Sequence, residues 1–591
     1  MLTGAACIAA AGTGDLDPTF GSGGIVTTAF PPPGAQAATE ILVQPDGRLV
    51  AVGVLRGPIN GGGIGVARYL ADGSLDPSFG SGGLVSYVTG LDNGVLAAGL
   101  LQPDGKIVAS IDVANGPQTL FIVRYNGDGT PDTGFGTSGQ IVLPEGSQIG
   151  FQSMVVHQGK LLVSMATANV AELRRFELSD GSPDTGFGAG GVVAPALATG
   201  PLVVQPDDKV LIAGPASQVA RVNADGSPDA SFGSGGLTSI PLPPPCSPFA
   251  NTYTPTSLVL QPDGTIVLLA ASPCEGIALI RYLPDGDPDP SFGMGGLVTS
   301  RPVGLFAEFA AVGFDLVLEP DGRLVVVGLS GPDFQDELLV AQFDPDGALD
   351  RTFGAGGRSV TPLLGRSYAL AAARQADGKL VIAANGAYTY FVVARYDLAC
   401  PALPDADGDG LGDACDTCTD PVVVQAPNVK FTHLAAPAGD EIIRLAGRLT
   451  IPLTPPIDPT ANGMQIALYD GSGAEMLYAV LDPLAIVPDG FEPIWRANHA
   501  GTTHTFEPGA LEPPAGIDKV SVRVIPSKSQ VKFKAWARQV TAAVAPGQIP
   551  LELRVTLDAR RSVAGQCGRL RFEAPNPVCV FSPSGNVLTC R

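Results

Sequence analysis

One short pattern recurs seven times between residues 15 and 396: an Asp followed three residues later by Phe-Gly. The copies stand at Asp17/Phe20, Asp76/Phe79, Asp132/Phe135, Asp184/Phe187, Asp229/Phe232, Asp289/Phe292 and Asp350/Phe353. Successive Phe residues are 45 to 61 positions apart. A period of this length is typical of a modular array, in which each unit buries its apolar face only by stacking on its neighbours.

Each copy carries further elements at matching places. A Gly-Gly and an apolar strand follow the Phe-Gly, as in residues 23–28, and a second strand ends in the turn Gln44-Pro45-Asp46-Gly47. Pro presets φ, Asp caps the turn and Gly takes positive φ, so the pattern predicts a hairpin to a third strand. A fourth strand ends in Arg68-Tyr69 or its equivalent.

Seven units of four short antiparallel strands predict an all-β fold, a seven-bladed β-propeller. A straight solenoid is the alternative, because a count of units does not prove that the array closes. If each blade ends after its Gly-Gly strand, residues 25–30 complete the seventh blade. That arrangement removes an exposed strand edge, so we expect a closed ring.

These recurring elements resemble the delta-60 repeat, a family of bacterial β-propellers of unassigned function. The resemblance covers residues 14–397. It implies a fold and supplies no catalytic residue.

Four segments are expected along the chain. Residues 1–13 are interpreted as a truncated export signal, with a disordered N-terminus as the alternative, and residues 14–397 as the propeller. Residues 398–420 form an acidic linker, and residues 421–591 a β-sandwich-like domain. Strands are expected there at Glu441–Leu453, Met464–Tyr469, Lys519–Ile525, Gln530–Arg538 and Leu551–Leu557, separated by Pro- and Gly-rich turns.

The linker holds acids with the spacing of a calcium loop. Asp405, Asp407, Asp409, Asp413 and Asp416 occupy positions 1, 3, 5, 9 and 12, and Gly410 stands at position 6. With the carbonyl of Leu411 they predict a Ca²⁺ site. The segment resembles a single thrombospondin type 3 repeat, an extracellular calcium-binding motif. An acidic, Gly-rich linker without an ion is the alternative.

Eight of the nine cysteines suit an exported protein with disulfides. They are Cys246, Cys274, Cys400, Cys415, Cys418, Cys567, Cys579 and Cys590. Cys246 and Cys274 fall in loops on one face of a single unit, so we expect them to pair, with two free thiols as the alternative. Cys400, Cys415 and Cys418 leave several pairings open, and the last three are expected to staple a C-terminal hairpin, one of them with Cys418 as an alternative partner. An extracellular or cell-surface location follows.

The two faces of the predicted ring differ in sequence. The Pro-Asp-Gly and Asp-to-Phe-Gly turns share one face and vary little, whereas the opposite loops, such as residues 31–34, 241–253 and 331–337, differ from unit to unit. We expect a glycan or protein ligand on this variable-loop face. The repeated Asp and Phe residues are interpreted as turn caps and interblade plugs, because a role in packing predicts recurrence in every blade.

Several functions are disfavoured. The net charge of −22 argues against nucleic acid as a partner. A membrane span is not predicted, because the chain has no run of 18 apolar residues. No catalytic motif appears, and His499 and His504 are interpreted as parts of a solvated loop. The sequence favours an exported, non-enzymatic binding or scaffold protein, with a propeller-based polysaccharide hydrolase or lyase as the alternative. The oligomeric state is not predicted.

Overall fold

A computed structural model describes most of residues 14–398 and 422–590. In the first part, the residues outside the description are 32–34, 58–60, 90–93, 114–118, 145–148, 168–169, 196–199, 216, 241–252, 273–275, 301–311, 331–336, 351–352, 355–356, 362, 364–368 and 387–389. In the second part they are 435–440, 452–463, 470–474, 482–483, 488–489, 494, 499, 501, 507–516, 541–550, 558–566, 573–578 and 583–586. The described residues form two compact units.

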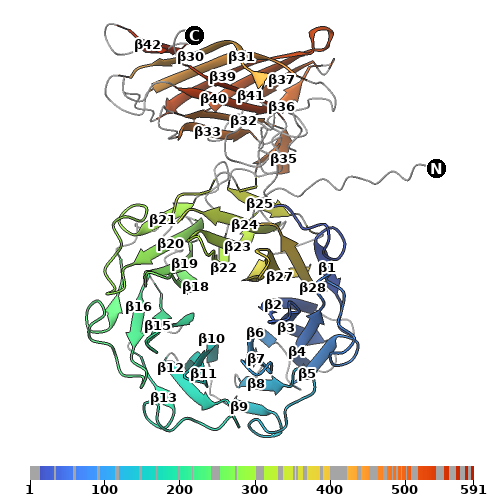
Figure 1. The fold of residues 1–591 in the computed structure, drawn as a ribbon, viewed down its shortest axis with the longest axis vertical. Helices are drawn as coiled ribbons and strands as arrows, with labels where there is room; N and C mark the ends of the chain where they lie inside the picture. Colours follow the sequence, from blue (N-terminus) through green and yellow to red (C-terminus); the bar gives the residue numbers. More distant parts are fainter. Residues whose placement is uncertain are drawn as a thin grey trace, which may run out of the picture. The chain divides into compact units, whose positions relative to one another are not determined.

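The first unit is a seven-bladed β-propeller of four-stranded antiparallel sheets (Figure 1). Six sheets follow chain order: β2 (Ala35–Val43), β3 (Leu49–Gly57), β4 (Gly61–Tyr69), β5 (Leu84–Val88); β6 (Gly94–Leu101), β7 (Ile107–Val113), β8 (Thr119–Tyr125), β9 (Gln140–Pro144); β10 (Ile149–His157), β11 (Lys160–Thr167), β12 (Val170–Glu177), β13 (Val192–Val193); β14 (Leu202–Val204), β15 (Val210–Ala213), β16 (Val219–Val222), β17 (Leu237–Thr238); β18 (Thr254–Leu260), β19 (Ile266–Ser272), β20 (Gly276–Tyr282), β21 (Leu297–Ser300); β22 (Val312–Leu318), β23 (Leu324–Ser330), β24 (Glu337–Phe343) and β25 (Arg358–Thr361).

The seventh sheet joins the two ends of the array. It contains β26 (Ala369–Arg374), β27 (Leu380–Gly386), β28 (Tyr390–Tyr396) and, as its outer strand, β1 (Ile25–Thr28). Ile25 is paired with Ala394 and Thr28 with Phe391. The closed ring and the completion of the last blade by the first strand are therefore confirmed, and the solenoid is excluded.

The propeller buries its apolar residues between neighbouring blades. One cluster combines Val52 and Val66 of the first blade with Ile111 and Val123 of the second. The Phe of each Asp-to-Phe-Gly pattern is fully buried, and Phe79 lies in this cluster. The prediction that these rings plug the gaps between blades is confirmed, because residues of two neighbouring blades complete one core.

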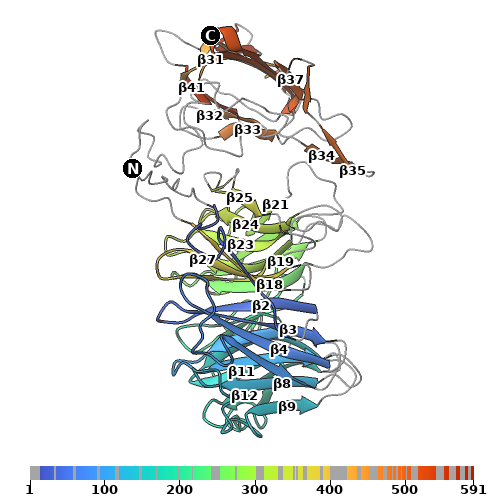
Figure 2. The ribbon, with the colours of Figure 1, turned by 90° about the vertical axis from the view of Figure 1, so that its right-hand side faces the viewer.

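The second unit has two large sheets around one core (Figure 2). The eight-stranded sheet has the order β36 (Trp495–Ala497), β37 (Thr503–Phe506), β38 (Ile517–Ile525), β39 (Gln530–Val540), β31 (Glu441–Thr450), β30 (Gln425–Thr432), β43 (Val587–Cys590), β42 (Cys579–Phe581). The five-stranded sheet has the order β29 (Val422–Val423), β41 (Cys567–Arg571), β40 (Glu552–Leu557), β32 (Met464–Tyr469), β33 (Glu475–Leu481). β34 (Leu484–Val487) and β35 (Gly490–Pro493) form a separate pair.

Residues from both large sheets share the core of this unit, as the sandwich prediction requires. Leu445 and Phe533 of the eight-stranded sheet and Ile466 and Val555 of the five-stranded sheet belong to one buried cluster. Along β39, buried Val531, Phe533, Ala535 and Ala537 alternate with more exposed residues, so the strand presents one face to the core and one to solvent. A 3-10 turn, η2 (Pro526–Lys528), joins β38 to β39.

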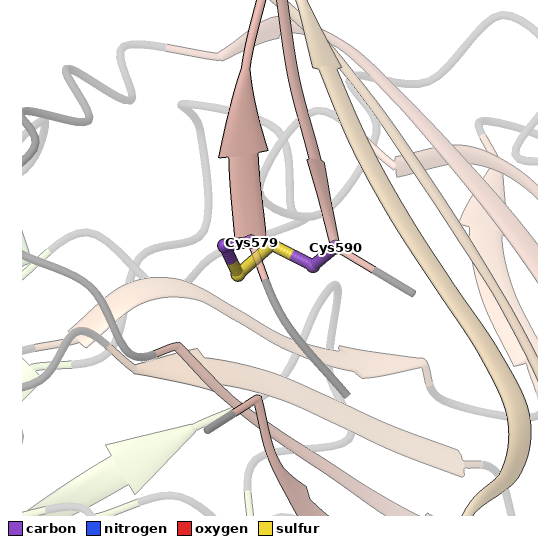
Figure 3. Close-up of a disulfide and its surroundings, with 2 residues drawn as sticks. All are labelled: Cys579 and Cys590. Carbon is purple, nitrogen blue, oxygen red and sulfur yellow. A yellow bond between two sulfur atoms is a disulfide. The ribbon is translucent and has the colours of Figure 1, made fainter. Parts of the chain in front are cut away.

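A disulfide links β42 to β43 in this unit (Figure 3). Cys579 and Cys590 stand opposite each other in the antiparallel pair, with a Cα–Cα distance of 3.9 Å. The expected staple of the C-terminal hairpin is therefore present for these two residues. No helix among the described residues is long and apolar enough to cross a membrane.

Candidate functional site

The repeated Asp and Arg side chains meet in a structure that we call the interblade clamp. In the first blade, Arg68 of β4 forms an ion pair with Asp76 at 2.9 Å and lies over the ring of Phe79, 4.5 Å from its centre. Asp76 Oδ1 also accepts a hydrogen bond from the backbone N–H of Ser78 at 2.9 Å, which caps the turn. Arg68 donates a further hydrogen bond to the carbonyl of Gly127 in the next repeat. One guanidinium thus joins two neighbouring repeats.

The clamp recurs around the ring. The equivalent ion pairs are Arg124–Asp132, Arg175–Asp184, Arg221–Asp229, Arg281–Asp289 and, across the seam, Arg395–Asp17, at 2.6 to 2.8 Å. A second cation at the start of the third strand approaches the same acid in most blades: Arg48, Lys106, Lys160, Lys209, Arg323 and Lys379. The interpretation of the repeated Asp residues as turn caps agrees with this geometry.

The sixth blade departs from the pattern. Gln342 replaces the arginine, and Arg323 donates hydrogen bonds to Gln342 Oε1 at 2.9 Å and to Asp350 Oδ2 at 3.4 Å. The cation of this clamp therefore stands just before β23, the third strand of the repeat, instead of near the end of β24, the fourth strand. The acid of this clamp thus still has a cationic partner, although that partner stands at a different position of the repeat.

The charges of the clamp control the protonation of its acids. Burial by itself would raise the pKa of Asp184, but hydrogen bonds from Lys160 and Arg175 outweigh it and lower the pKa to about 2. At Asp17, burial by itself would also raise the pKa. Hydrogen bonds from Lys379 and Thr19, together with the positive charge of Arg395, outweigh burial and hold this pKa well below its usual range. These acids are ionised and engaged at neutral pH, so the ring of Asp residues serves the architecture.

Two other acids lie on the innermost strands, Glu40 on β2 and Asp315 on β22. Both side chains are half-buried. Asp315 accepts hydrogen bonds from Ser257 Oγ at 2.8 Å and from the backbone N–H of Ala372 at 2.9 Å. Ser257 and Ala372 belong to the blades on either side, so the carboxylate bridges three neighbouring inner strands.

Glu40 stands in an unusual electrostatic environment. Burial raises its pKa to about 8, and the negative charge of Asp315 adds to the effect. Burial also raises the pKa of Asp315, although hydrogen bonds from Ala372 and Ser257 oppose the shift. Glu40 is therefore largely protonated at neutral pH. We call Glu40 and Asp315 the acid pair, because the charge of Asp315 acts on the Glu40 carboxyl in a ring that is otherwise repetitive.

Neither acid was singled out by the sequence analysis. Each stands four residues before the residue that begins the turn, Gln44 or Glu319, and the equivalent positions hold Ala98, Ser153, Pro201, Ser257 and Ala371. When the seven units are aligned on that turn, this position holds an acid in two units and a small or uncharged residue in the other five. This departure from the repeat was the available signal.

Most of the predicted site residues lie outside the described residues. These are the calcium-loop residues Asp405, Asp407, Asp409, Leu411, Asp413 and Asp416, and the cysteines Cys246, Cys274, Cys400, Cys415 and Cys418. Cys567 begins β41, and its side chain is not described.

The interpretation of His504 as part of a solvated loop was wrong. His504 lies on β37, opposite Ala497 of β36, and its side chain is 3% exposed. Its neighbours on the same strand, Thr503 and Thr505, are more exposed. The period-2 alternation of a half-buried strand was present over these four residues, but the stretch was too short to be recognised.

Comparison with known proteins gives a fold and little more. No curated protein matches the chain. The extracellular domain of a hybrid two-component system from B. thetaiotaomicron is 10% identical, with a TM-score of 0.36, and the match covers 91% of this chain but 55% of that one. This chain thus spans about half of that domain. A fungal alcohol oxidase of the AA5 family, in complex with copper, is 14% identical, with a TM-score of 0.37 and coverage of 92% and 98%. BamB from Moraxella catarrhalis is 12% identical, with a TM-score of 0.31 and coverage of 63% and 100%.

A family model matches the repeats themselves. It is described as "Domain of unknown function (DUF5122) beta-propeller" and matches residues 44–79, 102–135, 205–232, 261–292 and 319–353. Each matched segment begins at the turn that ends an inner strand and closes on the Phe of the interblade clamp. Five of the seven repeats therefore match the model of this β-propeller family, which is described as having no known function.

Proposed function

We propose that this is an exported, non-enzymatic binding or scaffold protein whose variable-loop face holds a glycan or protein ligand. The observation that carries the proposal is the contrast between the two faces of the ring. On the turn face, the recurring charged residues are engaged in interblade clamps. On the opposite face, the connections range from residues 168–169 between β11 and β12 to residues 239–253 between β17 and β18. Loops that vary on a rigid scaffold are the usual place for recognition.

The proposal is tested by a glycan-array and protein-capture screen with the full-length protein. A variant in which residues 241–252 are replaced by a short Gly-Ser linker should lose the ligand that the unmodified protein retains. The matched control replaces the turn-face residues 284–287 in the same blade by their counterparts 71–74 and should bind as before. Equal binding by the loop variant and the unmodified protein would place the ligand elsewhere.

The proposal includes one structural calcium ion at residues 405–416. Its support is the chemistry of the donor set: five carboxylates and the carbonyl of Leu411 are oxygen ligands, and Ca²⁺ takes about six to eight of them. The ion would order the segment that connects the two units. Isothermal titration of the chelator-treated protein should show one site that is lost in Asp407→Ala with Asp409→Ala. The absence of binding heat in the unmodified protein would reject the site.

A hydrolase or lyase acting on polysaccharide is the second candidate, and the acid pair on the inner strands favours it. A carboxyl held protonated near neutral pH is suited to general acid catalysis, and a second carboxylate is the usual partner in glycoside hydrolysis. Incubation with oligosaccharides followed by product analysis separates the two functions. Product release that is abolished in Glu40→Gln would establish the enzyme, and retention of intact glycan would support the binding protein.

A further inference from the structure

Charge is distributed unevenly along this chain. Residues 1–420 carry 19 Lys and Arg against 43 Asp and Glu, whereas residues 421–591 carry 16 against 14. The local excess of cations is concentrated further by the fold, because nine of the 16 cations lie on one side of the eight-stranded sheet. We call this side the cationic face; its cations are Lys430, Arg444, Arg448, Arg496, Lys519, Arg523, Lys532, Lys534 and Arg538.

Alternation along the strands places these residues together. On β39, Lys532, Lys534 and Arg538 alternate with the buried residues Val531, Phe533 and Ala537. Successive side chains of a strand point to opposite faces, so residues two apart lie about 7 Å from each other on one side. The same alternation applies on β31 and β38, whose buried residues Leu445 and Val522 belong to the core. The cations are therefore on the side of the sheet that faces away from this core.

The register aligns the cations in rows across the strands. Arg448 of β31 stands opposite Lys532 of β39, which stands opposite Arg523 of β38. In a second row, Lys430 is opposite Arg444. Neighbouring strands are about 4.8 Å apart, so like charges at directly opposite positions repel each other. Such repulsion reduces stability, and a surface whose purpose is solubility would mix both signs.

One acid among the described side chains of this face, Asp518, forms an ion pair with Arg538 at 2.9 Å. The centre of the face holds Trp536, a half-buried residue with Arg444 opposite it on one side and Lys519 on the other. An indole ring set among cations offers a flat apolar surface within a positive field. The C–H face of a pyranose ring packs against such a surface, while carboxylates on the sugar pair with the surrounding cations.

We propose that the cationic face of the C-terminal unit binds an acidic polysaccharide of the uronate class. The inference goes beyond the ligand proposed for the propeller, because it concerns a different surface. A single strand of nucleic acid is favoured less, since proteins bind it through several aromatic platforms, and Trp536 is the aromatic residue on the described central strands of this face. A lipid surface is favoured less, since interfacial binding requires bulky apolar side chains that reach past the cations.

The test measures the affinity of the full-length protein for polygalacturonic acid, with dextran as the neutral control. The unmodified protein should bind polygalacturonic acid, and binding should weaken as salt is added. Lys532→Gln with Lys534→Gln should reduce affinity about tenfold, since one exposed ion pair contributes at most about fivefold. Arg56→Gln with Lys528→Gln removes two exposed cations outside the face and should leave affinity within about twofold.

A second variant tests the role of the indole. Trp536→Leu should weaken binding of polygalacturonic acid but leave binding of polyglutamate, which has carboxylates and no sugar ring, unchanged. Failure of the unmodified protein to bind polygalacturonic acid would overturn the proposal, as would equal affinity in the Lys532/Lys534 variant. Tighter binding of single-stranded DNA, of anionic phosphatidylglycerol vesicles or of polyglutamate would overturn the assignment to a polysaccharide. Far-ultraviolet circular dichroism of each variant confirms that the fold is intact.

Discussion

The propeller and the C-terminal unit use charged side chains in opposite ways. In the propeller, acids and cations are paired inside interblade clamps, where Asp17 is 1% and Asp76 is 2% exposed. In the C-terminal unit, cations of one sign face solvent across a sheet, as Lys532 and Arg523 do on adjacent strands. Charges that recur in every repeat and are neutralised locally serve folding. Charges of one sign that gather on a solvent-exposed face are available to a partner.

The largest effect is expected where a clamp loses its aromatic plug. Phe79→Ala should destabilise the propeller by about 3–5 kcal/mol, because it leaves a cavity between two blades and removes the ring under Arg68. Urea unfolding monitored by near-ultraviolet circular dichroism measures the change. The control is Met294→Ala, at a side chain that is 89% exposed, which should shift stability by less than about 0.5 kcal/mol. Similar effects of the two variants would contradict the role assigned to the ring.

The next effect concerns the acid of the clamp. Asp17→Asn removes the partner of Arg395 and Lys379, each at 2.7 Å, and should cost about 3 kcal/mol, because it leaves a buried cation without its counter-charge. Asp350→Asn in the sixth blade should cost about 1 kcal/mol, because Arg323 lies 3.4 Å away and is partly exposed. Thermal unfolding of the two variants, recorded side by side, tests this order. A larger loss of stability in Asp350→Asn than in Asp17→Asn would show that the clamp of the sixth blade is the stronger one.

A further effect, which depends on pH, is expected from the acid pair. The pKa of Glu40 in the folded protein, about 8, lies above the value of about 4.3 in an unfolded chain. The folded protein therefore holds this proton more tightly, and the resulting stability is complete below about pH 4 and is lost as pH rises toward 8. Glu40→Gln should flatten the decline of the melting temperature between pH 5 and pH 8. Parallel profiles for the two proteins would contradict the shifted pKa.

The smallest effect is predicted on the cationic face. Lys532→Gln with Lys534→Gln should change the unfolding free energy by less than about 0.5 kcal/mol, since both side chains are exposed. Relief of repulsion between neighbouring strands favours a slight increase in stability. Differential scanning calorimetry of the full-length protein gives the measurement. A large loss would assign these lysines to the fold and would erase the contrast with the propeller.

The sequence predicted the parts of the fold that repeat. The seven Asp-to-Phe-Gly copies gave the blades, and the position of residues 25–30 gave the seam, because the same local turn chemistry acts in every unit. In the C-terminal unit, Met464–Tyr469 was predicted with its observed bounds, whereas short strands such as β36 (Trp495–Ala497) and β37 (Thr503–Phe506) were missed. Three or four residues do not establish a period.

The candidate sites were harder to predict because they depend on register and on the ring. Glu40 and Asp315 are 275 positions apart and interact only because the inner strands surround one axis. The cationic face has the same origin, since Arg448, Lys532 and Arg523 come from three strands that pair in an order different from that of the chain. The net charge of −22 conceals it, because an average over the chain mixes an acidic propeller with a basic sheet.

The seam between β1 and β28 has a consequence for the synthesis of the protein. The outer strand of the last blade is made first, and its partner strand is complete only when residue 396 has been added. Until then, the nascent blades present an unpaired edge at each end of the array. The propeller thus behaves as a late-closing unit during translation, and its unpaired edges are vulnerable to aggregation for roughly 20 to 75 seconds, the time that the ribosome needs to reach the final hairpin at about 5–20 residues per second.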